Sequence, residues 1–280
     1  MALIDGNQLA LAKHEGAGND FLVLVDLDRR VDLTPDLARA LCDRHKGVGA
    51  DGLLRVAAGE GGADLSMDLR NADGTEAAVS GNGLRCLGQA AVEAGLAPGP
   101  RFTVLTRAGV RTVIYREGDR PGRAMATVDM GPVRLGADQP QPMADRHVRE
   151  VDLGNPHLVL YGPDHPSTVA VAEIGVGIEA RRPDGVNVEF VALGPAPDEL
   201  VLRVWERGVG ETRACGSGSC AAAAAARSWG LVGERVRVHN PGGTLEVCLG
   251  PGELDPVLLG GPVHRVADVV VDLGALGLLE

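Results

Sequence analysis

The sequence predicts an α/β protein built from two similar halves. A helix rich in small residues is expected after Ser80, and a second one after Cys215. At equal distances from these starts, Gly95 and Gly230 are placed to end the two helices. Each helix is expected to follow a strand and a Gly-rich turn and to precede β-rich segments. Two such copies, 135 residues apart, indicate an internal duplication.

The duplication suggests where the chain divides. We expect an N-terminal half of residues 1–132 and a C-terminal half of residues 133–267, with the C-terminal strand 268–280 joining the first half. Residues 135–145 contain Pro, Gln and Gly and are expected to be a connector that carries the chain between the halves.

The composition limits the class of protein. A chain of 280 residues, 45% of them hydrophobic, is long enough for two cores. The net charge of −11 argues against nucleic acid as a partner, and no apolar run approaches the roughly 18 residues of a membrane span. Five cysteines without framework spacing favour free thiols in a reducing cytoplasm. Because no second Cys or His pair lies at ligand spacing from Cys215 and Cys220, no bound metal is expected.

Cys215 is the first candidate for chemistry. It lies at the start of the second expected helix, whose positive N-terminus should make a thiol lose its proton more easily than in water. The small residues 216–218 offer backbone N–H groups that can bind an anion, and residues 81–83 take the same places in the first half. The alternative is a buried structural cysteine before an Ala-rich core helix.

These features suit removal and return of a proton at the α-carbon of an amino acid. Two helix N-termini can stabilise the charge that develops on the carboxylate. A thiolate can take the proton and a thiol can return one on the other face, which inverts the centre. No pyridoxal-phosphate or nucleotide signature is present, so no cofactor is expected. The fork of Arg207 suits a second carboxylate. Further polar groups for a substrate are Asn19, Asn71, Asn155, Asn187 and Glu206.

Seven motifs, taken together and in order, resemble the diaminopimelate epimerase family along nearly the whole chain. They are residues 14–21, 44–51, 71–74, 80–83, 154–157, 187–190 and 206–218. The resemblance implies two pseudo-symmetric halves, each a mixed sheet or partial barrel wrapped around a central helix, with the active site in the cleft between them. It also implies a cofactor-independent isomerase, usually a cytoplasmic homodimer, which interconverts LL- and meso-diaminopimelate for lysine and peptidoglycan synthesis.

The resemblance implies roles for individual residues. Cys215 is expected to be one catalytic acid/base, with Glu206 and His157 tuning the catalytic cysteines. Arg207 is expected to bind the distal carboxylate of the substrate, and the asparagines and Glu206 to bind the remainder. The reacting α-carboxylate is expected to bind to Gly81, Asn82, Gly216 and Ser217. Without the resemblance, His157 is more readily explained as a structural histidine.

Ser80 stands where the family has its other catalytic cysteine. A hydroxyl keeps its proton near neutral pH unless a base activates it, so it is a poor base. Three explanations stay open: an engineered substitution, a natural epimerase with an activated hydroxyl, or one-sided chemistry of the kind found in dehydratase-like relatives. A catalytically impaired amino-acid-binding protein is the alternative from another class. Gly52 is a second departure, because some family members have a substrate-contacting Gln there.

Overall fold

The computed structural model describes residues 7–139, 146–252 and 255–278. The chain forms two compact units: unit 1 is Met1–Val128 with Pro262–Glu280, and unit 2 is Asp129–Gly261. The domain limits expected from the sequence, 132/133 and 267/268, stay predictions.

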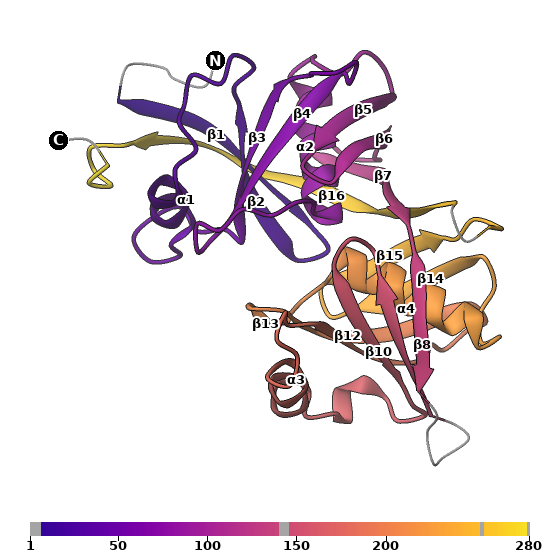
Figure 1. The fold of residues 1–280 in the computed structure, drawn as a ribbon. Helices are drawn as coiled ribbons and strands as arrows, with labels where there is room; N and C mark the ends of the chain where they lie inside the picture. The colour runs from indigo at the N-terminus through magenta and orange to yellow at the C-terminus, as the bar shows by residue number, and fades with distance from the viewer. Residues whose placement is uncertain (1–6, 140–145, 253–254, 279–280) are drawn as a thin grey trace. The chain divides into compact units, whose positions relative to one another are not determined.

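Unit 1 is a ring of strands around one helix (Figure 1). The strands hydrogen-bond in the order β1, β2, β3, β4, β5, β6, β7 and β16, and β16 also pairs with β1, which closes the ring and leaves no free edge. Their bounds are β1 Gln8–Gly16, β2 Asn19–Val25, β3 Gly52–Ala58, β4 Leu65–Asn71, β5 Arg101–Thr106, β6 Gly109–Glu117, β7 Arg123–Pro132 and β16 Pro256–Asp272.

The helix inside this ring is α2, Gly81–Glu93, in which every residue from Gly81 to Ala91 is buried. Its small residues allow the strands to come close: a Cβ on Gly88 would lie 2.8 Å from a methyl carbon of Val113 in β6. Gly95 follows the helix with a φ of +69°, a left-handed conformation in which glycine carries no Cβ penalty. The predicted end of the first helix is therefore confirmed.

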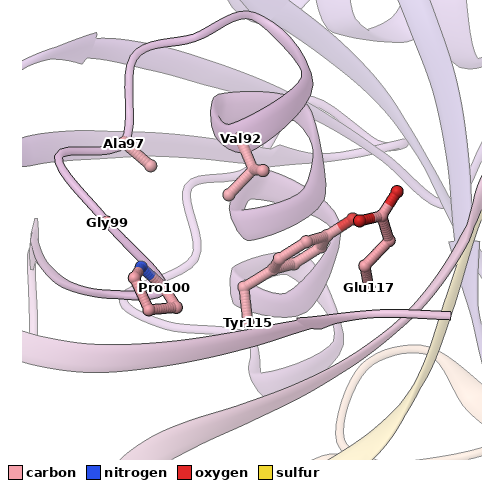
Figure 2. A pocket seen from close by; sticks show the side chains of 6 residues that line it. All are labelled: Val92, Ala97, Gly99, Pro100, Tyr115 and Glu117. Atoms are coloured by element: carbon pink, nitrogen blue, oxygen red, sulfur yellow. The ribbon is translucent and has the colours of Figure 1, made fainter.

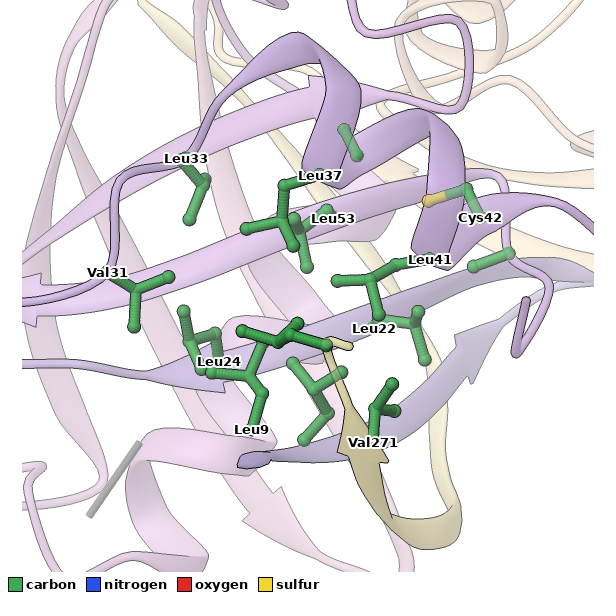
Figure 3. Packing of buried hydrophobic residues seen from close by; sticks show 14 residues of the cluster. Leu9, Leu22, Leu24, Val31, Leu33, Leu37, Leu41, Cys42, Leu53 and Val271 are labelled. Carbon is green, nitrogen blue, oxygen red and sulfur yellow. The ribbon is translucent and has the colours of Figure 1, made fainter. Parts of the chain in front are cut away.

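A second helix of unit 1, α1 (Pro35–Cys42), lies on the outer face of the ring. Thr34 caps it by accepting a hydrogen bond from the N–H of Leu37. Figure 3 shows the leucines of α1 packed against side chains of β1, β2, β3 and the end of β16. The members named in the figure are Leu9, Leu22, Leu24, Val31, Leu33, Leu37, Leu41, Cys42, Leu53 and Val271. This apolar cluster attaches α1 to the ring.

Unit 2 has the same plan. Its strands hydrogen-bond in the order β16, β15, β14, β12, β11, β10, β9 and β8, and β13 pairs with β12. The central helix is α4, and α3 with the short 3₁₀ helix η1 covers β11 and β12. The bounds are β8 Arg134–Gln139, β9 His147–Asp152, β10 Pro156–Tyr161, η1 Pro166–Thr168, α3 Val171–Glu179, β11 Asn187–Leu193, β12 Glu199–Glu206, β13 Gly210–Thr212, α4 Gly216–Ser228, β14 Arg235–Asn240 and β15 Gly243–Cys248.

The two units repeat one arrangement residue by residue. In unit 1, parallel strands β2 and β3 place Phe21 opposite Gly52. In unit 2, parallel strands β10 and β11 place His157 opposite Asn187. The central helices have 13 residues each and both begin after an N-cap residue in extended backbone. The internal duplication and the α/β fold class predicted from the sequence are confirmed.

One prediction about the chain path was wrong. Residues 134–139 form strand β8, which pairs with β9, rather than the start of an irregular connector. Strand β8 is exposed along its whole length and shows no apolar alternation, so the sequence carries no strand pattern there. The strand forms because β9 supplies partners for its backbone hydrogen bonds. The rest of the expected connector, residues 140–145, lies outside the described residues. The position of the active site in a cleft stays a prediction.

Candidate active site

In unit 2, the candidate residues gather at one end of the sheet because of strand direction. β10 and β11 are parallel and begin at this end, while β12 is antiparallel to β11 and finishes there. Helix α4 begins nearby, since a Cβ on its Gly218 would lie 2.9 Å from Oε1 of Glu189 in β11. The topology therefore brings together residues that the sequence separates by up to 62 positions, namely Asn155, His157, Asn187, Glu206, Arg207, Cys215, Gly216 and Ser217.

Cys215 is the N-cap residue of α4. Its Sγ accepts a hydrogen bond from the backbone N–H of Gly218 at 3.4 Å and lies 3.5 Å from Oγ of Ser217. Despite the helix N-terminus, burial raises the pKa of the Cys215 thiol well above its usual value, and the carboxylates of Glu206 and Glu189 raise it further. The prediction that this thiol loses its proton easily was wrong, because burial and the two carboxylates raise the pKa of Cys215 and so favour the protonated thiol.

The carboxyl group of Glu206 lies next to that thiol. It is the last residue of β12, and its carboxyl group accepts hydrogen bonds from Thr212 and from Cys215. Burial raises the pKa of Glu206 above its usual value, and the two hydrogen bonds only partly offset this. Burial therefore disfavours the charged form of both groups.

His157 contacts a carboxylate for which we had predicted no role. The ring Nδ1 of His157 lies 2.6 Å from Oε1 of Glu189, and both side chains are fully buried. Burial raises the pKa of Glu189, and the charge and hydrogen bond of His157 counteract this. The duplication could have identified Glu189, because it aligns this charged residue with an apolar residue, Leu54, of unit 1.

The other polar candidates of unit 2 differ in how much of their hydrogen-bonding capacity the fold already uses. Asn187 donates to the carbonyl of Pro156 at 3.0 Å and accepts from the N–H of Arg207 at 3.0 Å, so it ties the start of β10 to the turn after β12. The guanidinium of Arg207 is exposed and donates to the carbonyl of Asp184. Asn155 donates only weakly to Ser217, at 3.4 Å.

In unit 1, Ser80 occupies the place that Cys215 occupies in unit 2. It is the N-cap residue of α2, and its Oγ accepts a hydrogen bond from the N–H of Gly83 at 3.0 Å. The hydroxyl proton is then available to another acceptor. Gly81 begins α2 just as Gly216 begins α4.

A chain of hydrogen bonds links further candidates of unit 1. Asn82 donates to Oδ1 of Asn19 at 3.1 Å, and Asn19 donates to Asp51 at 2.7 Å. At the other end of this series of hydrogen bonds, the buried guanidinium of Arg85 donates to Oδ1 of Asn82 at 2.8 Å. The amide planes of Asn19 and Asn82 are thus oriented by a carboxylate and a guanidinium that we had not singled out. Asn71, at the end of β4, instead donates to Thr75 within its own turn.

A shallow pocket on unit 1 is separate from these residues. Figure 2 shows its lining, which consists of Val92, Ala97, Gly99, Pro100, Tyr115 and Glu117. Val92 lies at the opposite end of α2 from Ser80, about 18 Å away along the helix axis. The pocket is therefore not the candidate site.

Within residues 7–139, 146–252 and 255–278, no three His, Cys, Asp or Glu side chains are grouped as a metal site requires. The same residues include no helix with both the length and the apolar character of a membrane span.

Comparisons with known proteins place the chain in one family. The family model described as diaminopimelate epimerase matches residues 11–136 and 150–263. A diaminopimelate epimerase of Thioalkalivibrio sulfidiphilus is 38% identical over 95% of this chain and 100% of its own length. An O-ureido-serine racemase of Streptomyces lavendulae is 39% identical over 92% of this chain and 93% of its own length.

A solved structure shows the same fold at much lower identity. The hydroxyproline epimerase of Agrobacterium vitis, with trans-4-hydroxy-L-proline bound, has a TM-score of 0.73 at 17% identity and covers 96% of this chain and 93% of its own. Fold and family together define the class of protein as the amino-acid epimerases and racemases. Within that class, the chain belongs to the diaminopimelate epimerase family.

Proposed function

We propose that this protein is a cofactor-independent epimerase that interconverts LL- and meso-diaminopimelate by removing and returning the Cα proton. The observation that carries the proposal is the equivalence of Ser80 and Cys215. Both are N-cap residues of central helices, and both accept a hydrogen bond from the N–H group three residues on. Two proton-bearing groups in equivalent places suit a reaction that inverts one carbon atom.

The proposed proton path in unit 2 starts with Glu206 as the acceptor of the Cys215 proton. The resulting thiolate removes the Cα proton of the substrate, and the first N–H groups of α4, at Gly216 and Ser217, stabilise the charge on the carboxylate. Gly81 and Asn82 are proposed to do the same at α2. Ser80 is proposed to donate the proton that completes inversion in one direction. In the other direction Ser80 has to act as a base, and His157 is proposed to assist it.

The remaining candidates are proposed to bind the distal part of the substrate. Arg207 is exposed and its planar fork suits a carboxylate. Asn19, Asn71, Asn155 and Asn187 are proposed to bind the amino groups and carboxylates. O-ureido-serine is the second candidate substrate, because a racemase that acts on it is among the similar proteins. The ureido group of O-ureido-serine is neutral, whereas the distal group of diaminopimelate is a carboxylate. Arg207 is therefore proposed to contribute more to the binding of diaminopimelate than to that of O-ureido-serine.

Ser80 supports a second candidate function within the same site. A hydroxyl that donates but does not accept a proton would leave one-sided chemistry, such as a dehydratase-like reaction, or only amino-acid binding. The cellular setting is also a proposal: a cytoplasmic homodimer that supplies lysine and peptidoglycan precursors. The five cysteines, all free in the structure, are compatible with a reducing compartment.

The experiment follows Cα hydrogen exchange by NMR in deuterated water, separately for LL-diaminopimelate, meso-diaminopimelate and O-ureido-serine. The unchanged protein is compared with Ser80→Cys, Ser80→Ala and Cys215→Ser. We expect deuterium to enter both diaminopimelate isomers with interconversion, Ser80→Cys to be faster, and Ser80→Ala to lose inversion.

Other results would favour the other candidates. Exchange confined to one isomer, without inversion and restored by Ser80→Cys, would indicate one-sided chemistry. Faster exchange of O-ureido-serine than of either diaminopimelate isomer would move the substrate assignment to it. No exchange of any of the three, even with Ser80→Cys, would refute the epimerase proposal.

A further inference from the structure

The buried pair His157–Glu189 leaves one hydrogen-bonding atom of each side chain without a partner among the described residues. Nδ1 of His157 is bonded to Oε1 of Glu189, but Nε2 of His157 and Oε2 of Glu189 have no partner among the described residues. His157 is 1% exposed and Glu189 is 0% exposed. A buried polar atom without a partner costs free energy, so a pair that leaves two such atoms requires an explanation other than packing.

Unit 1 shows what the fold itself needs at these two positions. The strand registers make Phe21 the counterpart of His157 and Leu54 the counterpart of Glu189. Phe21 and Leu54 are both buried and apolar. Because the same strands and helix form in unit 1 with an apolar pair, the architecture does not require the polar pair of unit 2.

The contacts with the central helices support this equivalence. A Cβ on Gly83 of α2 would lie 3.5 Å from Cδ2 of Leu54, and a Cβ on Gly218 of α4 would lie 2.9 Å from Oε1 of Glu189. Leu54 and Glu189 therefore lie beneath the same turn of equivalent helices. In unit 2 that turn also contains the catalytic candidate Cys215.

We propose that Glu189 is a positioning residue of the reaction: its carboxylate holds the proton of His157 Nδ1, so that Nε2 is the ring atom that accepts and returns a proton. The inference rests on the proposed function and deepens it. With Nε2 unprotonated, the pair carries one negative charge. When Nε2 accepts the proton of the Ser80 hydroxyl that His157 is proposed to assist, the imidazolium formed is neutralised by the Glu189 carboxylate, and the pair returns to its first state when Nε2 gives that proton back to Ser80. The polar pair thereby gives unit 2 a base that the apolar pair of unit 1 cannot provide.

The first test observes the pair without any reaction. In protein with ¹⁵N-labelled histidine, the ring signals of His157 are assigned by their loss in His157→Gln. We expect a proton bound directly to Nδ1 in the unchanged protein. In Glu189→Leu, which removes the acceptor, the proton should move to Nε2. A neutral Nε2–H tautomer in the unchanged protein, or an unmoved proton in Glu189→Leu, would overturn the proposal.

The second test measures Cα exchange and turnover with Glu189→Gln, which keeps the size of the side chain and removes its charge. We expect kcat to fall about 100-fold with little change in KM, because the histidine is no longer oriented and neutralised as a base. An unchanged kcat contradicts the role of Glu189. If the unchanged protein exchanges no Cα hydrogen, the proposed function fails, whereas the tautomer measurement still decides on the pair.

The matched control for folding copies unit 1 into unit 2. We expect the double variant His157→Phe with Glu189→Leu to unfold at the same or a higher temperature than the unchanged protein, because well-packed apolar replacements of buried charged groups are often neutral or stabilising. A markedly lower unfolding temperature would mean that the pair serves packing, against the proposal.

Discussion

Cys215 and Ser80 show how much the surroundings of a residue decide its chemistry. The helix N-terminus favours a thiolate at Cys215, but burial and two nearby carboxylates outweigh it. In the proposed reaction, the thiol needs Glu206 to become a base, and the hydroxyl of Ser80 needs a base of its own. In this proposed reaction, both helices provide N–H groups that bind the carboxylate, while neighbouring side chains determine the direction of proton transfer.

Asp20 gives a testable consequence at the residue scale. Burial alone would raise its pKa, but hydrogen bonds from Arg44 and Lys13 lower the pKa of Asp20 from 3.8 to about 2. Between pH 2 and pH 3.8 the unfolded chain binds more protons than the folded chain. The ion pairs of Asp20 with Lys13 and Arg44 therefore stabilise the fold above about pH 4, and this contribution is lost as the pH falls through about 2. Asp20 is 15% exposed, so solvent screens it only partly.

We expect Asp20→Asn to lower the free energy of unfolding by about 1–2 kcal/mol at pH 7, and the difference from the unchanged protein to shrink as the pH falls from 4 to 2. Urea unfolding at a series of pH values measures this. Asp28→Asn is the control, since the Asp28–Arg30 pair is mostly exposed and its loss should change stability by less than about 0.5 kcal/mol. A difference that stays constant down to pH 3 would show that Asp20 is not the group that titrates.

The two central helices could be predicted from local sequence. Small-residue runs bounded by Ser80 and Gly95, and by Cys215 and Gly230, correspond to α2 and α4. Strand β8 could not be predicted in this way, because its stability comes from pairing with β9 and not from its own side chains. Local propensity is informative where an element buries its own apolar face and fails where the partner strand supplies the stabilisation.

Strand β16 offers a matched prediction at this scale. Val271 is 9% exposed and belongs to the apolar cluster beneath α1, whereas its neighbour Val270 is 58% exposed on the other face. We expect Val271→Ala to cost about 1–2 kcal/mol of stability and Val270→Ala less than about 0.5 kcal/mol. Both variants lose the same β-branched side chain, so thermal or urea unfolding of the two isolates the effect of burial. Equal losses would mean that strand propensity, and not the cluster, dominates here.

The whole chain is organised by two strands that contribute to both units. Residues of β7 and of β16 fall in unit 1 and in unit 2. In unit 1, the last part of β16 pairs with β1 from Gln8↔Asp272 to Glu15↔His264 and closes the ring around α2. Residues from the C-terminus are therefore required to complete the fold that begins at the N-terminus.

A truncation tests this dependence. A chain that ends after Gly261 loses Pro262–Glu280 and leaves β1 without one of its two partner strands. We expect the amides of α2 to lose their protection from hydrogen exchange, since exposed edges and an opened ring admit water. A chain that ends after Asp272 keeps every β1–β16 pair and should retain this protection. Protected α2 amides in the shorter chain would show that unit 1 folds without β16.

By itself, the sequence determined the duplication, the two central helices, their N-cap residues and the family, because each depends on residue order and local spacing. Only the tertiary structure decided the neighbours: the carboxylates that keep Cys215 protonated, the Arg85–Asn82–Asn19–Asp51 chain, and the pairing of His157 with Glu189. These properties depend on burial and on distances between strands, and the free energy of a charge depends on both far more than on its position in the sequence.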